Sequence, residues 1–453
     1  MYNRKIQIIY YIFFLSIISC EKKEVTFHQD VKSIIHQNCA SCHNLKGAAP
    51  FTLISYEDVA KRSQMISKVT TEKYMPPWPA DTDYRSFLNE KKISQEDIKT
   101  IIAWIEGGKK EGRLTHNHLL DSILAEKEVN QPDLTINMKQ AHNTNGLNQD
   151  EFLMMKFPFK LEQDTFIKKI EFIPNKKQIV HHINAHLITY NDNEKDNIFN
   201  GIYSIDTESF SDIESFQKLD LLNDDHTYPL LTRSVSNYLP GSEQTEYPPG
   251  IGGFIAKKKN VILVNDFHYG PTPYEETDSS YFNIYFSPEP PSRIIQETQL
   301  GTFGISKIIP ELVIPPNEIK SFTTRAMITK DISILTINPH MHLLGKSFLA
   351  YAITLKKDTI PLIKIDDWNF RWQYFYTFKK MLKIPAGSEI VVEAVYDNTE
   401  NNPDNPFYPP QEVSERLDFN GRGSMKTSNE MLQFIINYLP YEQGDENIDL
   451  GLK

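Results

Sequence analysis

The sequence predicts a multidomain protein in which a small all-α domain is followed by two tandem, all-β antiparallel sandwiches. The chain has 453 residues, which is enough for about three domains. Residues 24–112 show helical periodicity. From about residue 132 onward, short β-branched and aromatic runs alternate with Pro, Gly, Asn and Asp. This pattern continues for roughly 300 residues, a length typical of two sandwiches.

The first 20 residues have the form of a bacterial export signal. Arg4 and Lys5 precede an apolar run from Ile6 to Ile18, which is short for a bilayer span but suits a signal peptide. The ending Ile17-Ile18-Ser19-Cys20 resembles a lipobox, which implies that Cys20 is acylated and becomes the mature N-terminus. We therefore expect an exported protein, in the periplasm or at the cell surface, that is lipid-anchored to the outer membrane. A plain signal peptide with a chance cysteine is the alternative.

Changes in sequence pattern predict the domain boundaries. Residues 113–130 are polar and lack a strand pattern, so we interpret them as a connector. We predict, in order, a signal over 1–20, a helical domain over 21–113, a linker over 114–130, a first sandwich over 131–300 and a second sandwich over 301–445.

The last helix of the helical domain has a clear start and end. Ser94 and Asp97 form a capping box, because their side chains can satisfy amides at a helix start. An apolar stripe follows at Ile98, Ile101, Ile102 and Ile105. Gly107-Gly108 predicts a left-handed termination of this helix.

The helical domain carries a haem attachment motif. Cys39-Ala40-Ser41-Cys42-His43 has the c-type spacing, in which the thiols of Cys39 and Cys42 can bond to two haem vinyl groups while His43 ligates the iron. A zinc site would need two further ligands nearby, and a redox CxxC motif is expected in a βαβ context. Covalently bound haem c is therefore the favoured cofactor.

Met75 is the candidate for the second axial haem ligand. Its neighbours Pro76 and Pro77 stiffen the chain, so its thioether can be held with little loss of entropy. Met65, His28 and His36 are the alternatives. Residues 24–112 resemble a small class I cytochrome c, which implies that the helix starting after Ser94 packs at the haem edge.

The net charge of −11 is unevenly distributed along the chain. Residues 21–113 carry 15 Lys and Arg against 13 Asp and Glu, so the negative excess lies in residues 114–453. A region this acidic repels phosphate groups, which argues against nucleic-acid binding. The opposite signs favour docking of the helical domain on the β domains.

Cysteine usage limits the cofactors of the β domains. The three cysteines are Cys20, Cys39 and Cys42. The β domains therefore contain no disulfide, no iron–sulfur cluster and no blue-copper site with a cysteine ligand.

Histidines in the β domains form three groups: His181-His182, His268, and His340 with His342. Residues i and i+2 of a strand point to one face, so His340 and His342 can bind one metal ion directly. His181 and His182 would point to opposite faces, so both reach one ion only through a β-bulge or through different ring nitrogens. Imidazoles without a thiolate suit copper, zinc, iron or nickel.

The order of these histidines resembles that in the copper type II, ascorbate-dependent monooxygenases, a family that includes peptidylglycine α-hydroxylating and dopamine β-hydroxylating enzymes. The resemblance covers about residues 132–440 and implies two jelly-roll-like domains with two copper ions. It implies that His181, His182 and His268 hold the copper that stores an electron.

The same resemblance implies a second copper, where O2 is activated, at His340, His342 and Met431. Met431 follows a Gly-rich turn and an acidic residue, as the family methionine does. The sequences Trp368-Asn-Phe-Arg-Trp-Gln373 and Tyr396-Asp-Asn-Thr399 carry further similarity.

Three positions differ from the peptide-amidating branch of this family. Asn338 stands where that branch has an arginine that clamps the peptide carboxylate, and Gln433 and Ile435 replace an asparagine and a tyrosine. A carboxylate buried here would lack that cationic partner, which is costly. Peptide amidation is therefore disfavoured.

These features predict an exported haem–copper oxidoreductase that hydroxylates a C–H bond of an organic substrate with O2. The fused haem, ascorbate or another external electron donor would supply the electrons. One alternative is an electron-transfer or structural metal-binding protein that has no oxygenase chemistry. Another is a glycan-binding jelly roll fused to a cytochrome c, in which Trp368 and Trp372 stack on sugars.

Overall fold

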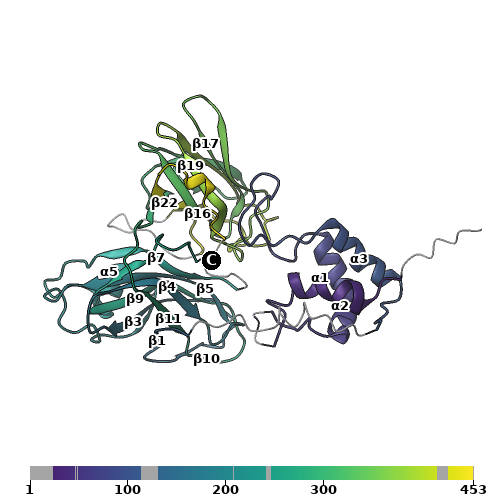
Figure 1. The fold of residues 1–453 in the computed structure, drawn as a ribbon, viewed down its shortest axis with the longest axis horizontal. Coiled ribbons are helices and arrows are strands. Elements are labelled where there is room, and N and C mark those ends of the chain that lie inside the picture. Colours follow the sequence, from purple (N-terminus) through teal and green to yellow (C-terminus); the bar gives the residue numbers. More distant parts are fainter. Residues whose placement is uncertain are drawn as a thin grey trace, which may run out of the picture.

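The computed structural model describes residues 24–45, 47, 49–113, 131–207, 209–240, 246–415 and 427–451. The predicted export signal with Cys20 and the predicted linker 114–130 lie outside the described residues. The described chain is mostly β-sheet, as the sequence predicts. Figure 1 shows two β-rich parts beside a small helical part.

The helical part contains four short or medium helical elements. They are η1 (Phe27–Val31), α1 (Lys32–Asn38), α2 (Tyr56–Thr71) and α3 (Gln95–Glu106). No helix in the described residues is both long and apolar enough to cross a membrane.

Helix α3 begins and ends where the sequence predicts. The Ser94 hydroxyl accepts a hydrogen bond from the Asp97 amide at 3.0 Å and caps the first turn. Gly108, just past the helix, has a φ of +90°, which a glycine adopts without strain. Ile98 and Ile101 are buried, together with Trp104, in the core of the helical part.

The first sandwich consists of antiparallel strands β1 to β11. Its four-stranded sheet runs in the order β1 (Leu134–Asn137), β11 (Tyr281–Ser287), β4 (Thr165–Ile173) and β8 (Phe254–Ala256). Its five-stranded sheet runs in the order β6 (Ser204–Asp206), β3 (Glu151–Lys160), β9 (Lys259–Tyr269), β5 (Val180–Tyr190) and β7 (Leu231–Tyr238). A two-stranded ribbon and a helix complete this part: β2 (His142–Asn143), β10 (Thr277–Asp278) and α5 (Asp212–Lys218).

The second sandwich, β12 to β22, repeats this arrangement of four and five antiparallel strands. The four-stranded sheet runs in the order β12 (Gln296–Gly301), β22 (Gln433–Pro440), β16 (Ile332–His340) and β19 (Tyr376–Ile384). The five-stranded sheet runs in the order β13 (Ile308–Ile309), β15 (Ile319–Met327), β20 (Glu389–Asp397), β17 (Gly345–Ile353) and β18 (Thr359–Ile365). The remaining elements are β14 (Val313–Ile314), β21 (Val413–Ser414) and the 3-10 helix η2 (Asp445–Asn447).

Apolar side chains fill the space between the two sheets of each sandwich. In the first sandwich, Phe172 contacts Phe267 and Phe282 at ring-centroid distances of 5.6 and 5.2 Å. These three residues lie on β4, β9 and β11, so they join the two sheets. The described β domains hold together through packing of this kind, without disulfides.

The chain between α2 and α3 leaves the helical part and lies on the second sandwich. Ala80 and Phe87 are buried in the core of that sandwich, and each forms an isolated β-bridge to it, with Ile365 and Phe378 respectively. The Leu88 amide donates to the Thr377 carbonyl at 2.7 Å. The sequence did not predict this placement.

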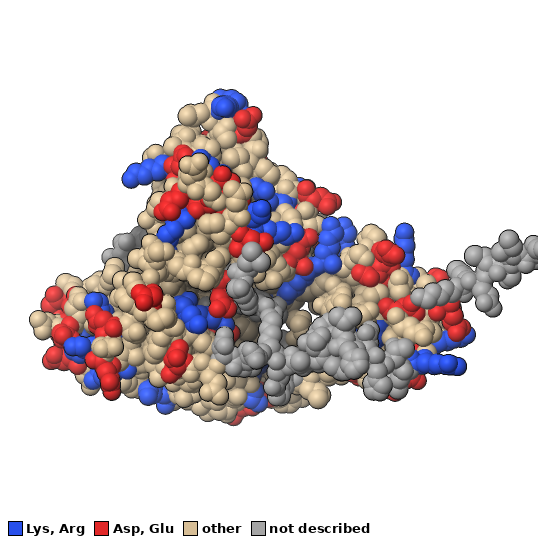
Figure 2. All heavy atoms as spheres, in the orientation of Figure 1, with Lys and Arg blue, Asp and Glu red and all other residues tan. Residues whose placement is uncertain are grey.

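Charges of both signs on the incoming segment contact the second sandwich. Lys364 on the sandwich faces Asp81 on that segment, with 3.4 Å between nitrogen and oxygen, and Arg85 of the segment donates to the Pro361 carbonyl at 2.9 Å. Figure 2 shows Lys and Arg interspersed with Asp and Glu over the visible face. The contact therefore combines buried apolar side chains with local polar pairs.

Candidate metal centres

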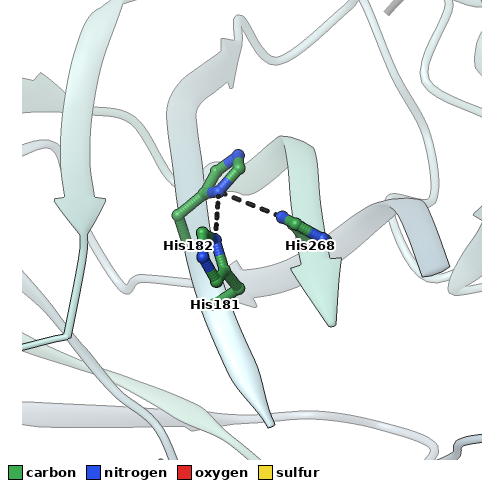
Figure 3. A group of neighbouring side chains, drawn as sticks. All are labelled: His181, His182 and His268. Carbon is green, nitrogen blue, oxygen red and sulfur yellow. Dashed lines mark hydrogen bonds between the residues drawn. The ribbon is translucent and has the colours of Figure 1, made fainter. Parts of the chain in front are cut away.

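The first cluster consists of His181, His182 and His268, on neighbouring strands of the five-stranded sheet (Figure 3). His182 on β5 lies directly opposite His268 on β9. The register shifts between Val180 and His182, so His181 is the extra residue of a β-bulge. The bulge that the adjacent histidine pair requires is therefore present, and all three rings reach one place.

The three Nδ1 atoms of the first cluster face one another. His182 Nδ1 lies 3.1 Å from His181 Nδ1 and 3.2 Å from His268 Nδ1, and candidate ligand atoms of all three residues lie within 4.8 Å of one another. Figure 3 shows this convergence. The described chain therefore offers three imidazole nitrogens to a single ion.

Carboxylates accept hydrogen bonds from the Nε2 atoms of two of these rings. His182 Nε2 donates to Asp266 Oδ2 at 2.9 Å, and His268 Nε2 donates to Asp150 Oδ1 at 2.7 Å. Because a carboxylate only accepts, each neutral ring carries its proton on Nε2 and its lone pair on Nδ1. Two lone pairs then face each other, an arrangement that a cation between them stabilises. A carboxylate that orients a ligating histidine is the usual support of a metal site.

The electrostatics of the first cluster favour neutral rings. Burial, together with the neighbouring His182 and His268, lowers the pKa of His181 to about 2. Burial also lowers the pKa of His268. Burial alone would raise the pKa of Asp266, but the adjacent His182 outweighs it and holds that pKa at about 2. Burial thus favours neutral His181 and His268, the form that binds metal, beside an ionised supporting carboxylate.

The second cluster contains His340 and His342, at the end of β16 in the other sandwich. Their ring centroids lie 5.0 Å apart, with the ring planes at 90°. His340 Nδ1 donates to the Gln373 side-chain oxygen, and His342 Nδ1 donates to the Asn429 carbonyl at 2.8 Å. In the neutral rings Nε2 therefore carries the lone pair. Burial, together with His342, lowers the pKa of His340 to about 3.

The backbone of Met431 is held near that of His342 by a shared hydrogen-bond partner. One oxygen of Glu430 accepts from both the His342 amide at 2.9 Å and the Met431 amide at 3.2 Å. Burial raises the pKa of Glu430 to about 8, although these amides act in the other direction. Met431 is only 1% exposed, and its carbonyl accepts from Tyr396 Oη at 2.7 Å. The Gly-rich turn before it lies outside the described residues.

Met431 lies two residues before β22, the strand that pairs with β16. His340 pairs with Gln433 at the start of β22. This register and the shared contacts of Glu430 bring the backbone of Met431 close to those of the two histidines.

A cavity of about 190 Å³ lies between the sandwiches and is lined from both sides. His182 and Asp266 line it from the first sandwich, and His340 and Gln373 line it from the second. It is where a substrate could reach both clusters.

The three positions that differ from the peptide-amidating branch, Asn338, Gln433 and Ile435, all line this cavity. Arg233 lines it as well, with its guanidinium 4.7 Å from the centre of the Phe254 ring. The lining of the cavity therefore contains a cation although position 338 is an asparagine.

The residues of the predicted haem attachment motif, Cys39, Cys42 and His43, lie together just after α1 in the helical part. Cys39 and Cys42 are free thiols and partly buried, and burial raises the pKa of Cys39 to about 12. His43 Nδ1 donates to the Phe51 carbonyl at 3.0 Å, which leaves the lone pair on Nε2. Two thiols and an oriented imidazole are the donor set that covalent haem requires.

Met75 is partly buried just past α2, with its amide bonded to the Val69 carbonyl at 3.0 Å. Among the alternatives, His28 contacts Glu111 at 3.3 Å and His36 contacts the Ile54 carbonyl at 3.0 Å, each through Nε2. Met65 is 52% exposed. Each of these two histidines bonds through one ring nitrogen, so they do not drop out as alternatives to Met75, which stays a prediction.

Several residues that support these sites were not identified from the sequence. Asp266 lies two residues before His268, and residues two apart on a strand share a face. This spacing could have identified Asp266 as a neighbour of the cluster. Asp150 lies far along the chain from His268, so no local pattern marks it as a partner. Gln373 and Glu430 stand in segments that carry the family resemblance, but the sequence does not show which histidines they contact.

Residues 301–405 match the family model "Copper type II ascorbate-dependent monooxygenase, C-terminal domain". This range contains both histidines of the second cluster, and the match supports a copper monooxygenase enzyme. A search of curated proteins finds no match.

One solved structure that the chain resembles is titled "Structure of infectious bursal disease virus Gt strain". The match has 10% identity, covers 70% of this chain and 83% of that chain, and has a TM-score of 0.15. No inference about fold or function follows from a score this low.

Proposed function

We propose that this protein is an exported haem–copper oxidoreductase whose β-sandwiches hydroxylate a C–H bond of an organic substrate with O2. The observation that carries the proposal is the convergence of the His181, His182 and His268 Nδ1 atoms, with two of the rings fixed by carboxylates. The family match of residues 301–405 independently supports copper in the second sandwich.

The two clusters differ in donor chemistry, which suits different tasks. The first cluster offers three nitrogens and is held rigidly by Asp266 and Asp150. The second offers two imidazoles and, in our assignment, the thioether of Met431, a soft donor that favours Cu(I). Bound copper would supply electron storage at the first cluster and O2 activation at the second.

The residues around the second cluster set the reaction geometry. Gln373 and the Asn429 carbonyl fix the rings of His340 and His342 so that both Nε2 lone pairs are available. Glu430 fixes the backbone of His342 relative to Met431. Hydroxylation places one oxygen atom on the substrate and releases the other as water, so it consumes two electrons and two protons.

We propose that haem c, bound through Cys39, Cys42, His43 and Met75, is one source of these electrons. Two contacts near the haem residues support this. At the first contact, the side-chain nitrogen of Gln178 donates to the Gly47 carbonyl at 3.3 Å. Gln178 lies three residues before His181.

At the other contact, Trp78 lies 5.5 Å from Tyr374, whose hydroxyl donates to the Pro77 carbonyl. Tyr374 adjoins Gln373, the partner of His340. The haem loop and the Met75 segment thus each contact a segment that leads to a histidine cluster. Ascorbate or another external donor is the other source.

We further propose that the chain is exported and tethered to the outer membrane through acylated Cys20, facing the periplasm or the outside. The charged pair and apolar run that precede Cys20 in the sequence support this. Haem attachment outside the cytoplasm is consistent with the same route.

Elemental analysis combined with O2 uptake tests the proposed function. Purified protein without the signal should contain one iron as haem and bind two copper ions. Reduced, copper-loaded protein should consume O2 faster when its organic substrate is added. Zinc in place of copper, or copper without substrate-dependent uptake, would favour a metal-binding or electron-transfer protein. Glycan binding that a chelator leaves unchanged would favour the sugar-binding alternative.

A further inference from the structure

Tyr374 on the second sandwich is contacted by three residues of the segment between α2 and α3. Its hydroxyl donates to the Pro77 carbonyl at 3.1 Å, and its ring centroid lies 5.5 Å from that of Trp78. The Lys91 ammonium lies 5.0 Å from the centre of the same ring. Met75, the candidate haem ligand, lies two residues before Pro77. Tyr374 therefore links the second sandwich to the segment that carries Met75.

The backbone of Tyr374 is tied to the strand that carries His340. The neighbouring Gln373 accepts from His340 Nδ1 through its side-chain oxygen. The Asn338 side chain, two residues before His340, donates to the Tyr374 carbonyl at 3.0 Å. Asn338 stands where the peptide-amidating branch has an arginine, so in this chain that position holds Tyr374 in place. Tyr374 thus contacts the helical part with its side chain and the second cluster through its backbone and its neighbour.

Trp78 extends the aromatic contact between the helical part and the second sandwich. Its ring centroid lies 5.2 Å from that of Tyr376, in an edge-to-face arrangement at 77°. Its buried Nε1 has no hydrogen-bond partner among the residues that the structure describes. A buried donor without a partner is costly, and a carboxylate of the predicted haem is an acceptor that would satisfy it. Trp78 therefore suits a position beside the haem.

Cys42 links the haem attachment motif to Tyr374 independently of Met75. Burial raises the pKa of Tyr374, and the Cys42 thiol adds to this increase. The same thiol adds to the effect of burial on Tyr238, and both tyrosines line the cavity between the sandwiches. Because Coulomb interactions weaken with distance, these effects place the thiol in the neighbourhood of the two tyrosines.

One hydrogen-bonded route joins the haem loop to the first cluster. The Gln178 side chain donates to the Gly47 carbonyl at 3.3 Å, and the chain then runs through three peptide units to His181. This path has a saturated carbon atom at every residue and contains no aromatic ring before the histidine itself. Electronic coupling falls with each saturated bond, so this route is weak.

The route through Tyr374 contains an aromatic ring and fewer saturated carbon atoms. It crosses the hydrogen bond to Pro77, the ring and one peptide unit to Gln373, whose side chain meets His340. A π-system carries electronic coupling better than a saturated chain does. The contacts therefore favour the second cluster as the point where the haem electron enters.

We propose that Tyr374 is a positioning residue for electron transfer, which couples the haem to His340 so that the copper of the second cluster receives the haem electron without passage through the first cluster. This inference rests on the proposed function, because it requires haem c and copper on one chain. In the step, the haem iron is oxidised from Fe(II) to Fe(III), and Cu(II) is reduced to Cu(I). No atom is transferred, and Tyr374 remains a neutral phenol.

A laser-flash experiment on the purified, oxidised and copper-loaded full chain tests this inference. Under argon, a soluble photoreductant reduces the haem, and the visible spectrum then follows its reoxidation by Cu(II). The variants are Tyr374→Phe, which keeps the ring and loses the bond to Pro77, and Tyr374→Leu, which removes both. Gln178→Leu is the matched control, because it removes the other side-chain contact to a carbonyl of the helical part.

Haem reoxidation should be fastest in the unmodified protein, slower in Tyr374→Phe, and slower by at least an order of magnitude in Tyr374→Leu. Gln178→Leu should keep the unmodified rate. Redox titration should give the same haem and copper potentials in all four proteins, so that a slower rate reports lost coupling rather than a changed driving force. An unchanged rate in Tyr374→Leu, or an equal loss in Gln178→Leu, would overturn the inference.

Removal of one copper at a time identifies the electron acceptor and does not depend on the folding of Tyr374→Leu. His268→Ala, which lacks a ligand of the first cluster, should keep the reoxidation phase, whereas His340→Ala should lose it. The reverse result would show that the haem electron enters at the first cluster. If the unmodified protein contains no haem or no copper at the second cluster, its spectrum and metal content reveal this before the flash. That result refutes the proposed function itself and is distinct from failure of the Tyr374 route.

Discussion

His182 and His268 lie directly opposite each other on β5 and β9, with their Nδ1 atoms 3.2 Å apart and each Nε2 bonded to a carboxylate. This pairing turns two ring nitrogens with lone pairs towards one point. The bulge at His181 adds a third nitrogen, so the sheet itself builds the first site.

Replacing His268 tests the first site. His268→Ala removes one of three donors, so we expect the first copper to be lost from the purified protein while the second copper and the haem spectrum remain. Copper counting and the visible spectrum measure this. Retention of both copper ions would show that His268 is not a ligand.

The supporting carboxylates allow a graded test. Asp266→Asn keeps the shape of the side chain and removes the charge that orients His182, so we expect copper affinity at the first site to fall by about 10- to 100-fold. Asp150 is 49% exposed, so Asp150→Asn should have a smaller effect. Competition with a chelator measures both affinities. Equal affinities in all three proteins would contradict the supporting role.

Met431 is tested by a change that keeps its volume. Met431→Leu removes the sulfur and preserves the packing, so we expect substrate hydroxylation to be abolished while the haem and most first-site copper are retained. Met431→Ala should act in the same way but also lower the free energy of unfolding by about 2–5 kcal/mol, because it opens a cavity in a buried site. Full turnover in Met431→Leu would refute the assignment of the oxygen-activating site.

The stability of the metal-free protein should depend on pH. His181 has a pKa of about 2 and His340 about 3 in the folded chain, against an ordinary value of 6.5. Between these values the unfolded chain binds more protons, so the free energy of unfolding falls as pH decreases below about 6.5. Each histidine contributes at most about 1.4 kcal/mol per pH unit in this window.

Urea denaturation at several pH values measures this dependence. The double variant His181→Gln, His340→Gln should show a shallower loss of stability between pH 6.5 and pH 4. An identical slope in the two metal-free proteins would show that these histidines are not held neutral by the fold.

The histidine groups and the strand-like pattern could be predicted from the sequence because they depend on local spacing. The adjacent pair at residues 181 and 182 required a bulge, and the structure has one. Likewise, Ser94 and Gly108 mark the limits of α3 because capping and left-handed glycine geometry act within a few residues. The haem ligands and lipid anchor stay predictions, and Cys20 lies outside the described residues.

The sequence by itself determined which donors are available and in what order they occur along the chain. Only the tertiary structure decided that Asp150 supports His268, that the chain around Phe87 packs in the second sandwich, and that the Phe370 ring lies near imidazoles of both clusters. The physical reason is that these contacts join residues far apart along the chain. They depend on how sheets pack and loops cross between domains, which local periodicity does not encode.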